Sequence, residues 1–252
     1  MANRLRALLS EGKTAFGVWI MLSSPAAVEM IALMGFDYVG IDCQHGLLGY
    51  EEMRDILLML RGFETTALVR VPSSDAAGVG RALDAGAEAI VVPMVNSRPD
   101  AERAVDACRF PPEGSRSFGP ARAHQPFGRD PVEINREVLC FAMIETRDGL
   151  AAADEICSTP GVDGIYVGPS DLALSLGLSP TATEHPAEHV EAVERVLATC
   201  AAHGIVPAIH AYGGKNARMR ADQGFKMVTV TADAAVLALG SLNELGTARA
   251  TS

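Results

Sequence analysis

The sequence predicts a closed barrel of eight parallel β-strands, each followed by a helix, in a single domain over residues 1–252. Short apolar stretches alternate eight times with stretches of helical spacing. The predicted strands are apolar throughout, which is typical of parallel strands covered on both faces. Eight such units in 252 residues match the usual size of a TIM (β/α)8 barrel.

An open doubly wound sheet is the alternative architecture. It would favour fewer strands and a glycine-rich phosphate loop after the first strand. Residues 19–26, WIMLSSPA, follow the predicted first strand and contain no GxGxxG motif. The sequence therefore favours the closed barrel.

The individual elements follow from their apolar runs and from the residues that bound them. The first helix begins with Ser24-Pro25 and ends at Gly35, which are ordinary start and stop signals. A long loop rich in glycine, proline and arginine covers 111–130. The predicted strands are 15–22, 36–42, 65–71, 87–95, 139–145, 161–169, 205–211 and 225–231. The predicted helices are 24–35, 49–62, 75–86, 98–110, 147–161, 171–177, 189–204, 215–224 and 234–245.

Composition excludes several function classes. The formal net charge of -10 argues against nucleic-acid binding, which requires clusters of Lys and Arg. The five cysteines are scattered without a CxxC pair and are expected to be reduced. No secretory leader and no run of eighteen apolar residues is present, so we expect a cytoplasmic protein without a membrane partner.

Polar residues follow the predicted strands at the end where barrel enzymes carry their chemistry. Two acids, Glu145 and Asp171, end neighbouring strands. Hard cations such as Mg²⁺ or Mn²⁺ take few protein carboxylates and fill their remaining positions with water or substrate oxygens. The acids are therefore candidate metal ligands, and the alternative is that each caps the helix that follows it.

Two further strand ends supply groups for acid–base chemistry. Arg70 would be a fixed cation for an oxyanion or carboxylate, unless it is simply solvated. His45 is a candidate base because its ordinary pKa lies near neutral pH. An acid would orient that histidine, and the candidates are Asp42 and Asp84, although Asp84 lies on a helix and could be a solvated surface residue.

Six segments carry a resemblance to a known family and together span most of the chain. They are IDCQHG (41–46), ALVRV (67–71), LDAGAEAIVVPMVNS (83–97), PPEGSRSFGPARA (111–123), MIETRDGL (143–150) and VDGIYVGPSDLALSLG (162–177). The chain resembles the HpcH/HpaI family of metal-dependent (class II) 2-oxo acid aldolases, which includes 4-hydroxy-2-oxoheptanedioate and 2-dehydro-3-deoxyglucarate aldolases.

The resemblance implies roles for the strand-end residues. Glu145 and Asp171 would hold Mg²⁺, Mn²⁺ or Co²⁺, and His45 would be the base, made more basic by Asp84. Arg70 would stabilise the enolate of pyruvate or a close relative. The backbone N–H of Ser170, in the segment Gly168-Pro169-Ser170, would help hold the carboxylate of the 2-oxo acid. Members resemble one another in forming hexamers, here a trimer of dimers, with the last helix on a neighbouring subunit.

Two positions depart from the pattern that the family resemblance implies. Gln44 stands where many members have an acid, and Met143 stands where many have a glutamine that contacts the 2-oxo acid. These departures put a strict preference for pyruvate in doubt. The segments QHG, SFGPARA and AMIETR resemble a branch that also accepts hydroxypyruvate.

The aldehyde acceptor would be bound by less specific features. Trp19 could form an apolar wall, and the loop 111–130 could reach over the site with Arg116 and Arg122, or else be a subunit contact or solvated. His210 could line the pocket. The remaining histidines, His124, His185, His189 and His203, are expected at the surface.

Other mechanisms and functions are less well supported. A Schiff-base aldolase needs a buried strand lysine, and the three lysines (Lys13, Lys215 and Lys226) lie near polar segment edges. A related CoA-thioester lyase would predict an additional basic loop or phosphate-binding glycines. A barrel retained for binding alone would have lost the acids or the histidine, and all are present.

Overall fold

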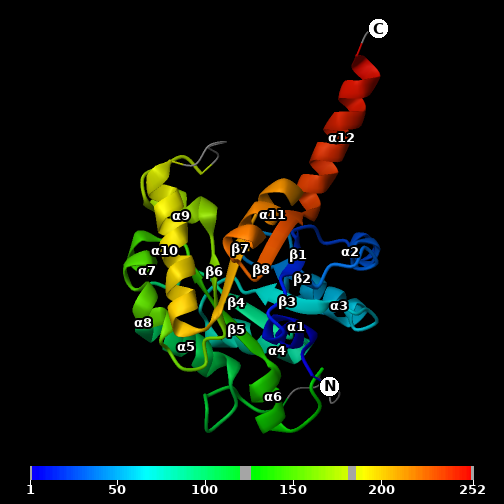
Figure 1. The fold of residues 1–252 in the computed structure, drawn as a ribbon. Helices are drawn as coiled ribbons and strands as arrows, with labels where there is room; N and C mark the ends of the chain where they lie inside the picture. The colour runs from blue at the N-terminus through cyan, green and yellow to red at the C-terminus, as the bar shows by residue number, and fades with distance from the viewer. Residues whose placement is uncertain (1, 120–125, 181–185, 251–252) are drawn as a thin grey trace.

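A computed structural model describes residues 2–119, 126–180 and 186–250 and confirms the predicted parallel barrel (Figure 1). The strands follow one another around the barrel in chain order, and β8 closes it by pairing with β1. Their bounds are β1 Ala15–Ile20, β2 Tyr38–Asp42, β3 Thr66–Arg70, β4 Ala89–Val92, β5 Leu139–Ile144, β6 Gly164–Val167, β7 Val206–His210 and β8 Met227–Ala232.

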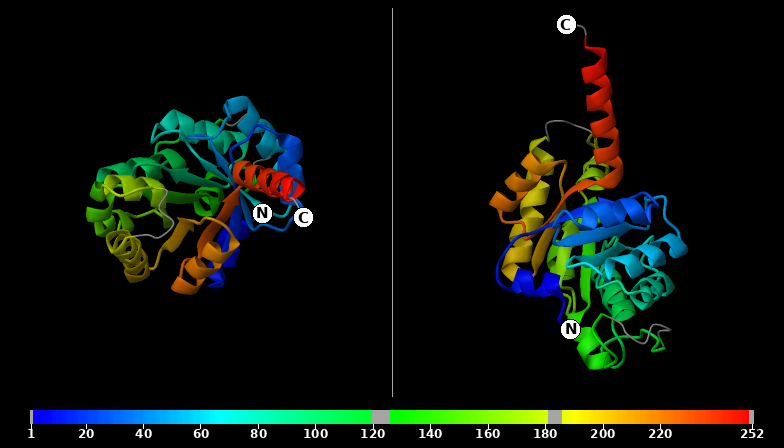
Figure 2. Two further views of the ribbon diagram at one scale, coloured as in Figure 1. Left: turned by 90° about the horizontal axis from the view of Figure 1, so that it is seen from above. Right: turned by 90° about the vertical axis from the view of Figure 1, so that its right-hand side faces the viewer.

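Helices surround the barrel as an outer layer (Figure 2). They are α1 Arg4–Ser10, α2 Pro25–Ala32, α3 Tyr50–Leu60, α4 Ala76–Ala85, α5 Arg98–Cys108, α6 Pro131–Glu137, α7 Arg147–Ala151, α8 Ala153–Cys157, α9 Pro169–Ser175, α10 Ala187–His203, α11 Gly214–Gln223 and α12 Asp233–Arg249. Sequence analysis missed α1 and α6, and it read α7 and α8 as one helix. No helix in the described part of the chain has the length and apolarity that crossing a bilayer requires.

The barrel interior is packed with side chains rather than open. Tyr38 and Tyr166 meet there, and their hydroxyls lie 2.8 and 2.5 Å from the Thr229 hydroxyl. Glycine is required where Trp19 crosses the interior, because a β-carbon on Gly40 would lie 2.3 Å from the Trp19 ring. A filled interior leaves the ends of the barrel as the places where a small molecule can bind.

The two ends of the barrel differ. The N-terminal segment crosses the amino end, where Asn3 donates hydrogen bonds to the carbonyls of Glu88 and Glu137. At the carboxyl end, β8 runs into α12, which projects away from the barrel (Figures 1 and 2). Asp233, the first residue of α12, accepts hydrogen bonds from the backbone N–H groups of Met21 and Leu22 and so ties this helix to the end of β1.

Candidate active site

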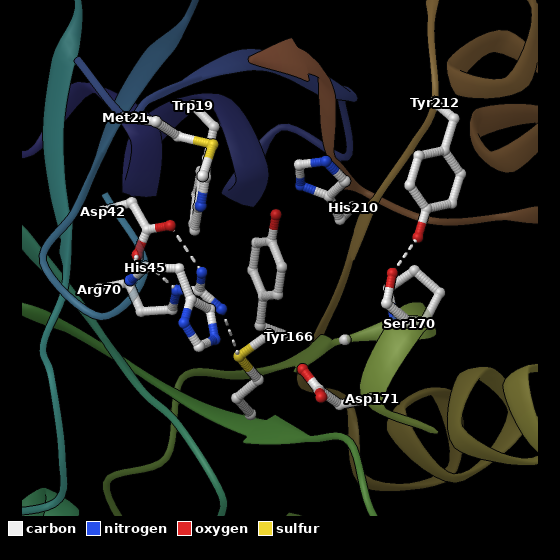
Figure 3. A pocket seen from close by; sticks show the side chains of 13 residues that line it. Trp19, Met21, Asp42, His45, Arg70, Tyr166, Ser170, Asp171, His210 and Tyr212 are labelled. Carbon is white, nitrogen blue, oxygen red and sulfur yellow. Dashed lines mark hydrogen bonds and ion pairs between the residues drawn. The ribbon is translucent and has the colours of Figure 1, made fainter. Parts of the chain in front are cut away.

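A pocket opens at the carboxyl ends of the strands (Figure 3). It brings together eight of the residues that the sequence singled out: Trp19, Asp42, His45, Arg70, Gly168, Pro169, Ser170 and Asp171. His210 and Met143, which the sequence also brought into the argument, line it as well, together with three residues that sequence reasoning did not place there: Met21, Tyr166 and Tyr212. Polar groups from several strand ends therefore converge on one cavity.

Asp42 and Arg70 form a buried ion pair on one wall of the pocket. They are register partners on β2 and β3, and Arg70 Nε and Nη2 lie 2.9 and 2.7 Å from the two Asp42 oxygens. Burial alone would raise the Asp42 pKa, but the hydrogen bonds and charge of Arg70 outweigh it, so the pKa lies below its ordinary value. The pair fixes the guanidinium plane beside the pocket.

Asp42 also holds the turn that carries His45. Its Oδ1 accepts hydrogen bonds from the backbone N–H groups of Gln44 and His45, at 3.1 and 3.2 Å. Asp42 therefore orients His45 through the backbone and not, as an orienting acid would, through the imidazole ring. The imidazole lines the pocket, and no hydrogen bond from it to another described residue is present. It is accessible to accept a proton from a bound molecule.

Glu145 and Asp171 form an acid pair at the ends of β5 and β6. Glu145 is 1% exposed, and its Oε1 accepts a 2.7 Å hydrogen bond from the Met94 backbone N–H. Its Oε2 is buried without a hydrogen-bond partner among the described residues. Burial is the main reason that the Glu145 pKa rises to about 7, and the nearby Asp171 charge raises it further. A buried carboxylate oxygen in this state fits a bound proton or cation.

Neither acid caps a helix. Thr146 is the N-cap of α7, and Gly168 occupies the N-cap position of α9. The capping alternative for Glu145 and Asp171 is therefore wrong. Gly168 has a different function, because a β-carbon there would lie 2.7 Å from Glu145 Oε2. Only glycine lets the β6 end approach this carboxylate so closely.

Met94 supports the acid pair from the end of β4, where the sequence shows only an apolar residue. Its backbone is left-handed, with φ of 57°, a conformation that costs a non-glycine residue about 1–3 kcal/mol. In this conformation its N–H donates to Glu145. The position could not be found from residue type, because the contact is made by the backbone.

Aromatic and neutral side chains line another part of the pocket, beginning at Trp19 beside Arg70 (Figure 3). Trp19 stacks on Tyr166 with ring centroids 5.3 Å apart. The His210 ring makes edge contacts with Trp19 and Tyr212, and the Tyr212 hydroxyl lies 2.6 Å from the Ser170 hydroxyl. Burial and the Arg70 charge lower the His210 pKa to about 4, so this imidazole is neutral at pH 7.

Asp84 and Arg116 lie away from the pocket of their own chain. Asp84 is near the C-terminal end of α4, which leads into β4 at the amino end of the barrel. Its carboxylate pairs with Arg116 at 2.7 Å, and Arg116 also stacks over the Phe110 ring at 4.3 Å. The described parts of the loop, 111–119 and 126–130, follow α5 toward the amino end of the barrel, and none of their residues lines the pocket. Arg122 lies outside the described residues.

One of the four histidines that the sequence analysis expected at the surface is buried instead. His189 is fully buried, and its Nε2 lies 2.9 Å from the Pro169 carbonyl oxygen, so its assignment to the surface is wrong. His203 lies 2.8 Å from an Asp154 oxygen with its side chain 26% exposed. His124 and His185 lie outside the described residues.

Fold and pocket together define the class: a (β/α)8-barrel enzyme with an acid pair, an arginine and an accessible histidine at the carboxyl ends of its strands. The model of the HpcH/HpaI aldolase/citrate lyase family matches residues 15–238. The chain belongs to this family, as the sequence motifs implied.

Individual relatives agree with this assignment. A hydroxypyruvate/pyruvate aldolase from Rhizorhabdus wittichii is 35% identical over 249 residues, covering 98% of this chain and 99% of the relative. A 5-keto-4-deoxy-D-glucarate aldolase from Citrobacter koseri is 33% identical over 237 residues, covering 93% of this chain and 91% of the relative. The structure of an HpcH/HpaI aldolase/citrate lyase family protein from Burkholderia cenocepacia J2315 superposes with a TM-score of 0.92 at 32% identity, covering 99% of this chain and all of that one.

The expected enzyme class is confirmed. The chain is an aldolase-type carbon–carbon lyase, and the alternative of a barrel retained only for binding is wrong. The names of these relatives favour an aldolase over a CoA-thioester lyase.

Proposed function

We propose that this chain is a divalent-metal-dependent aldolase that joins a 2-oxo acid, pyruvate or hydroxypyruvate, to an aldehyde, and that it also catalyses the reverse cleavage. The observation that carries the proposal is the buried, unpartnered Oε2 of Glu145 beside Asp171. In an aldolase site, this pair of acids would hold the cation. Asp171 lines the same cavity as Arg70 and His45, whereas Glu145 is buried behind the cavity wall.

The acid pair fits a hard cation by its chemistry. Two carboxylates leave most ligand positions to water and substrate oxygens, as Mg²⁺ and Mn²⁺ prefer. Among the described residues no cluster of three or more His, Cys, Asp or Glu side chains could hold a metal, and a two-acid site lies below that number. A bound Mg²⁺, Mn²⁺ or Co²⁺ would polarise the 2-oxo acid and acidify its C3 protons.

The residues of the chain do the rest of the chemistry. His45 takes a proton from C3, and the charge that develops on the keto oxygen is held by Arg70. C3 then bonds to the aldehyde carbon, and the aldehyde oxygen becomes a hydroxyl by taking back the proton that His45 removed from C3. The Ser170 backbone N–H, presented by the segment Gly168-Pro169-Ser170, holds the carboxylate of the 2-oxo acid.

The donor preference rests on Met143. This residue lines the pocket, and its sulfur lies 3.9 Å from Arg70 Nη1. Methionine is flexible and polarisable, so its side chain can move to make room for the additional hydroxyl of hydroxypyruvate more readily than a fixed glutamine amide could. The relative that is named for both donors supports acceptance of hydroxypyruvate as well as pyruvate.

We propose further that the chain assembles as a homo-hexamer, a trimer of dimers, through α12. Five apolar side chains on this helix are 46–66% exposed: Val236, Leu237, Leu239, Leu242 and Leu245. A projecting helix with such side chains on its surface is suited to packing on another subunit. A role of Asp84 toward His45, or of Arg116 toward the aldehyde, requires a neighbouring subunit, because both lie away from the pocket of their own chain.

A cytoplasmic location is supported by the cysteines. All five are free thiols, and four of them are buried. Such thiols are typical of proteins from a reducing compartment.

The test is an aldol addition assay with a simple acceptor. Pyruvate and hydroxypyruvate are each incubated with glycolaldehyde and the protein, with Mg²⁺ or Mn²⁺ and again with EDTA, and adducts are followed by chromatography. Adduct formation that requires the metal supports the proposal. Adducts of equal yield in EDTA would contradict the metal requirement.

A further inference from the structure

His189 is buried directly behind the pocket, in the first turn of α10. It is 0% exposed, and its Nε2 lies 2.9 Å from the Pro169 carbonyl oxygen. A carbonyl oxygen only accepts hydrogen bonds, so Nε2 must carry the hydrogen. The bond therefore runs in one direction, from α10 to the first residue of α9.

The peptide that receives this bond lies at the pocket wall. Pro169 is followed by Ser170 and Asp171, and all three line the cavity. The carbonyl and the N–H of one trans peptide point in opposite directions. The bond from His189 to the Pro169 carbonyl therefore directs the Ser170 N–H away from α10. It also fixes the position of Pro169, two residues before Asp171.

His189 adds a restraint from a second helix to the start of α9, where no side chain caps the helix. Its N-cap is Gly168, which makes no side-chain cap hydrogen bond. The backbone bonds are those from Gly168 N–H to the Ile144 carbonyl and from Leu172 N–H to the Gly168 carbonyl. Within α9 the Pro169 carbonyl also accepts the regular helical bond from the Ala173 N–H, and the bond from His189 adds a second donor that comes from α10.

We propose that His189 is a positioning residue for the 2-oxo acid site, and this inference rests on the proposed function. From α10 it holds the Pro169–Ser170 peptide so that Ser170 and Asp171 present their groups to the cavity. It does not touch the substrate. Removing its N–H leaves the ligands in place but loosens the segment that carries them.

Two substitutions separate the hydrogen bond from the packing of the ring. His189→Gln places an amide N–H near the Nε2 position and should keep the bond. His189→Phe keeps a ring but has no donor. His203→Phe, at the other end of α10, is the matched control, because it removes a histidine bond to Asp154 instead. Circular dichroism and thermal melting check that each variant folds.

The first measurement is amide hydrogen exchange of residues 168–173 in the free protein, by mass spectrometry. We expect exchange in His189→Phe to be faster by about tenfold, as for a lost hydrogen bond. We expect wild-type exchange in His189→Gln and His203→Phe. Unchanged exchange in His189→Phe would overturn the proposal. This measurement uses no substrate, so its outcome does not depend on whether the protein is an active aldolase.

The second measurement is the KM and kcat of the 2-oxo acid in Mn²⁺-dependent C3 exchange. We expect His189→Phe to raise KM by about tenfold with a smaller change in kcat, the size typical of lost support behind metal and substrate ligands. His189→Gln should restore KM. Faster amide exchange with an unchanged KM in an active enzyme would reduce His189 to a packing residue and overturn the proposal. Inactive wild-type protein would instead count against the aldolase function itself.

Discussion

Arg70 donates two hydrogen bonds to Asp42 across the neighbouring strands β3 and β2, with side chains only 8% and 0% exposed. The same aspartate holds the backbone of the turn that carries His45. One buried carboxylate thus positions both the cation and the candidate base. Arg70 and His45 are therefore both held at the pocket by the same residue, Asp42.

This shared support predicts a large stability effect. Asp42→Ala leaves a buried guanidinium without its partner, so we expect the free energy of unfolding to fall by about 3–5 kcal/mol. Urea denaturation measures it. The control is Glu64→Ala, which breaks an exposed pair with Arg4 and should cost less than about 1 kcal/mol. Equal losses in the two variants would contradict the assigned role of Asp42.

The acid pair predicts selective loss of metal binding. Glu145→Gln and Asp171→Asn should each raise the Mn²⁺ dissociation constant by about tenfold or more, because each removes a charged ligand. Isothermal titration calorimetry measures this constant. Asp148→Asn removes an exposed acid three residues beyond Glu145 and should bind Mn²⁺ as wild type does. A wild-type constant in Glu145→Gln would exclude this carboxylate as a ligand.

Gly168 predicts a steric effect on the same acid. In Gly168→Ala the new β-carbon would lie 2.7 Å from Glu145 Oε2 and from the Met143 methyl group. We expect a loss of about 1–3 kcal/mol in unfolding free energy and weaker Mn²⁺ binding. Gly80→Ala is the control, because open space surrounds that helical glycine and alanine should stabilise it by about 0.5–1 kcal/mol. If Gly168→Ala is as stable as Gly80→Ala, the close approach is not as described.

His210 predicts a pH effect on stability. Its pKa is lowered to about 4 in the folded protein, so between pH 6.5 and 4 the unfolded chain binds more protons than the folded one. Stability from this group therefore falls as the pH drops through that window. Glu145, with its raised pKa of about 7, acts with the opposite sign, so variants must be compared.

The comparison is urea unfolding of wild type and His210→Gln at pH 7 and pH 5. We expect a smaller loss of stability on acidification in His210→Gln, because glutamine does not titrate. An identical loss in both proteins would show that His210 binds protons equally in the folded and unfolded states.

Local sequence patterns were sufficient to predict the barrel. Continuously apolar runs indicate strands buried on both faces, and helical spacing indicates helices with one buried face. Eight repeats of this pair favour a closed barrel over other folds. The helices α1 and α6 have only seven residues each and do not directly follow a strand, so neither helical period nor the strand–helix alternation indicated them. The sequence left open whether loop 111–130 reaches over the pocket, because residue type does not show at which end of a barrel a loop lies.

The pocket was predictable where its lining comes from side chains at strand ends, as with Arg70 and His45. The site was not predictable where backbone atoms act, as with Met94, whose N–H supports Glu145. His189 was assigned to the surface because one histidine on a helix gives no sign of the element that packs against it. Tyr212, two residues beyond His210, could have been found by reading further past the strand end.

The most direct test of the aldolase account is exchange of the C3 protons of pyruvate and hydroxypyruvate in D₂O, followed by NMR. It requires no knowledge of the aldehyde. The account predicts exchange with Mn²⁺ or Mg²⁺, its loss in EDTA, and a fall of about 10²–10⁴-fold in His45→Ala that still folds and binds Mn²⁺. Absence of exchange with both donors, in folded and metal-bound wild-type protein, would contradict it.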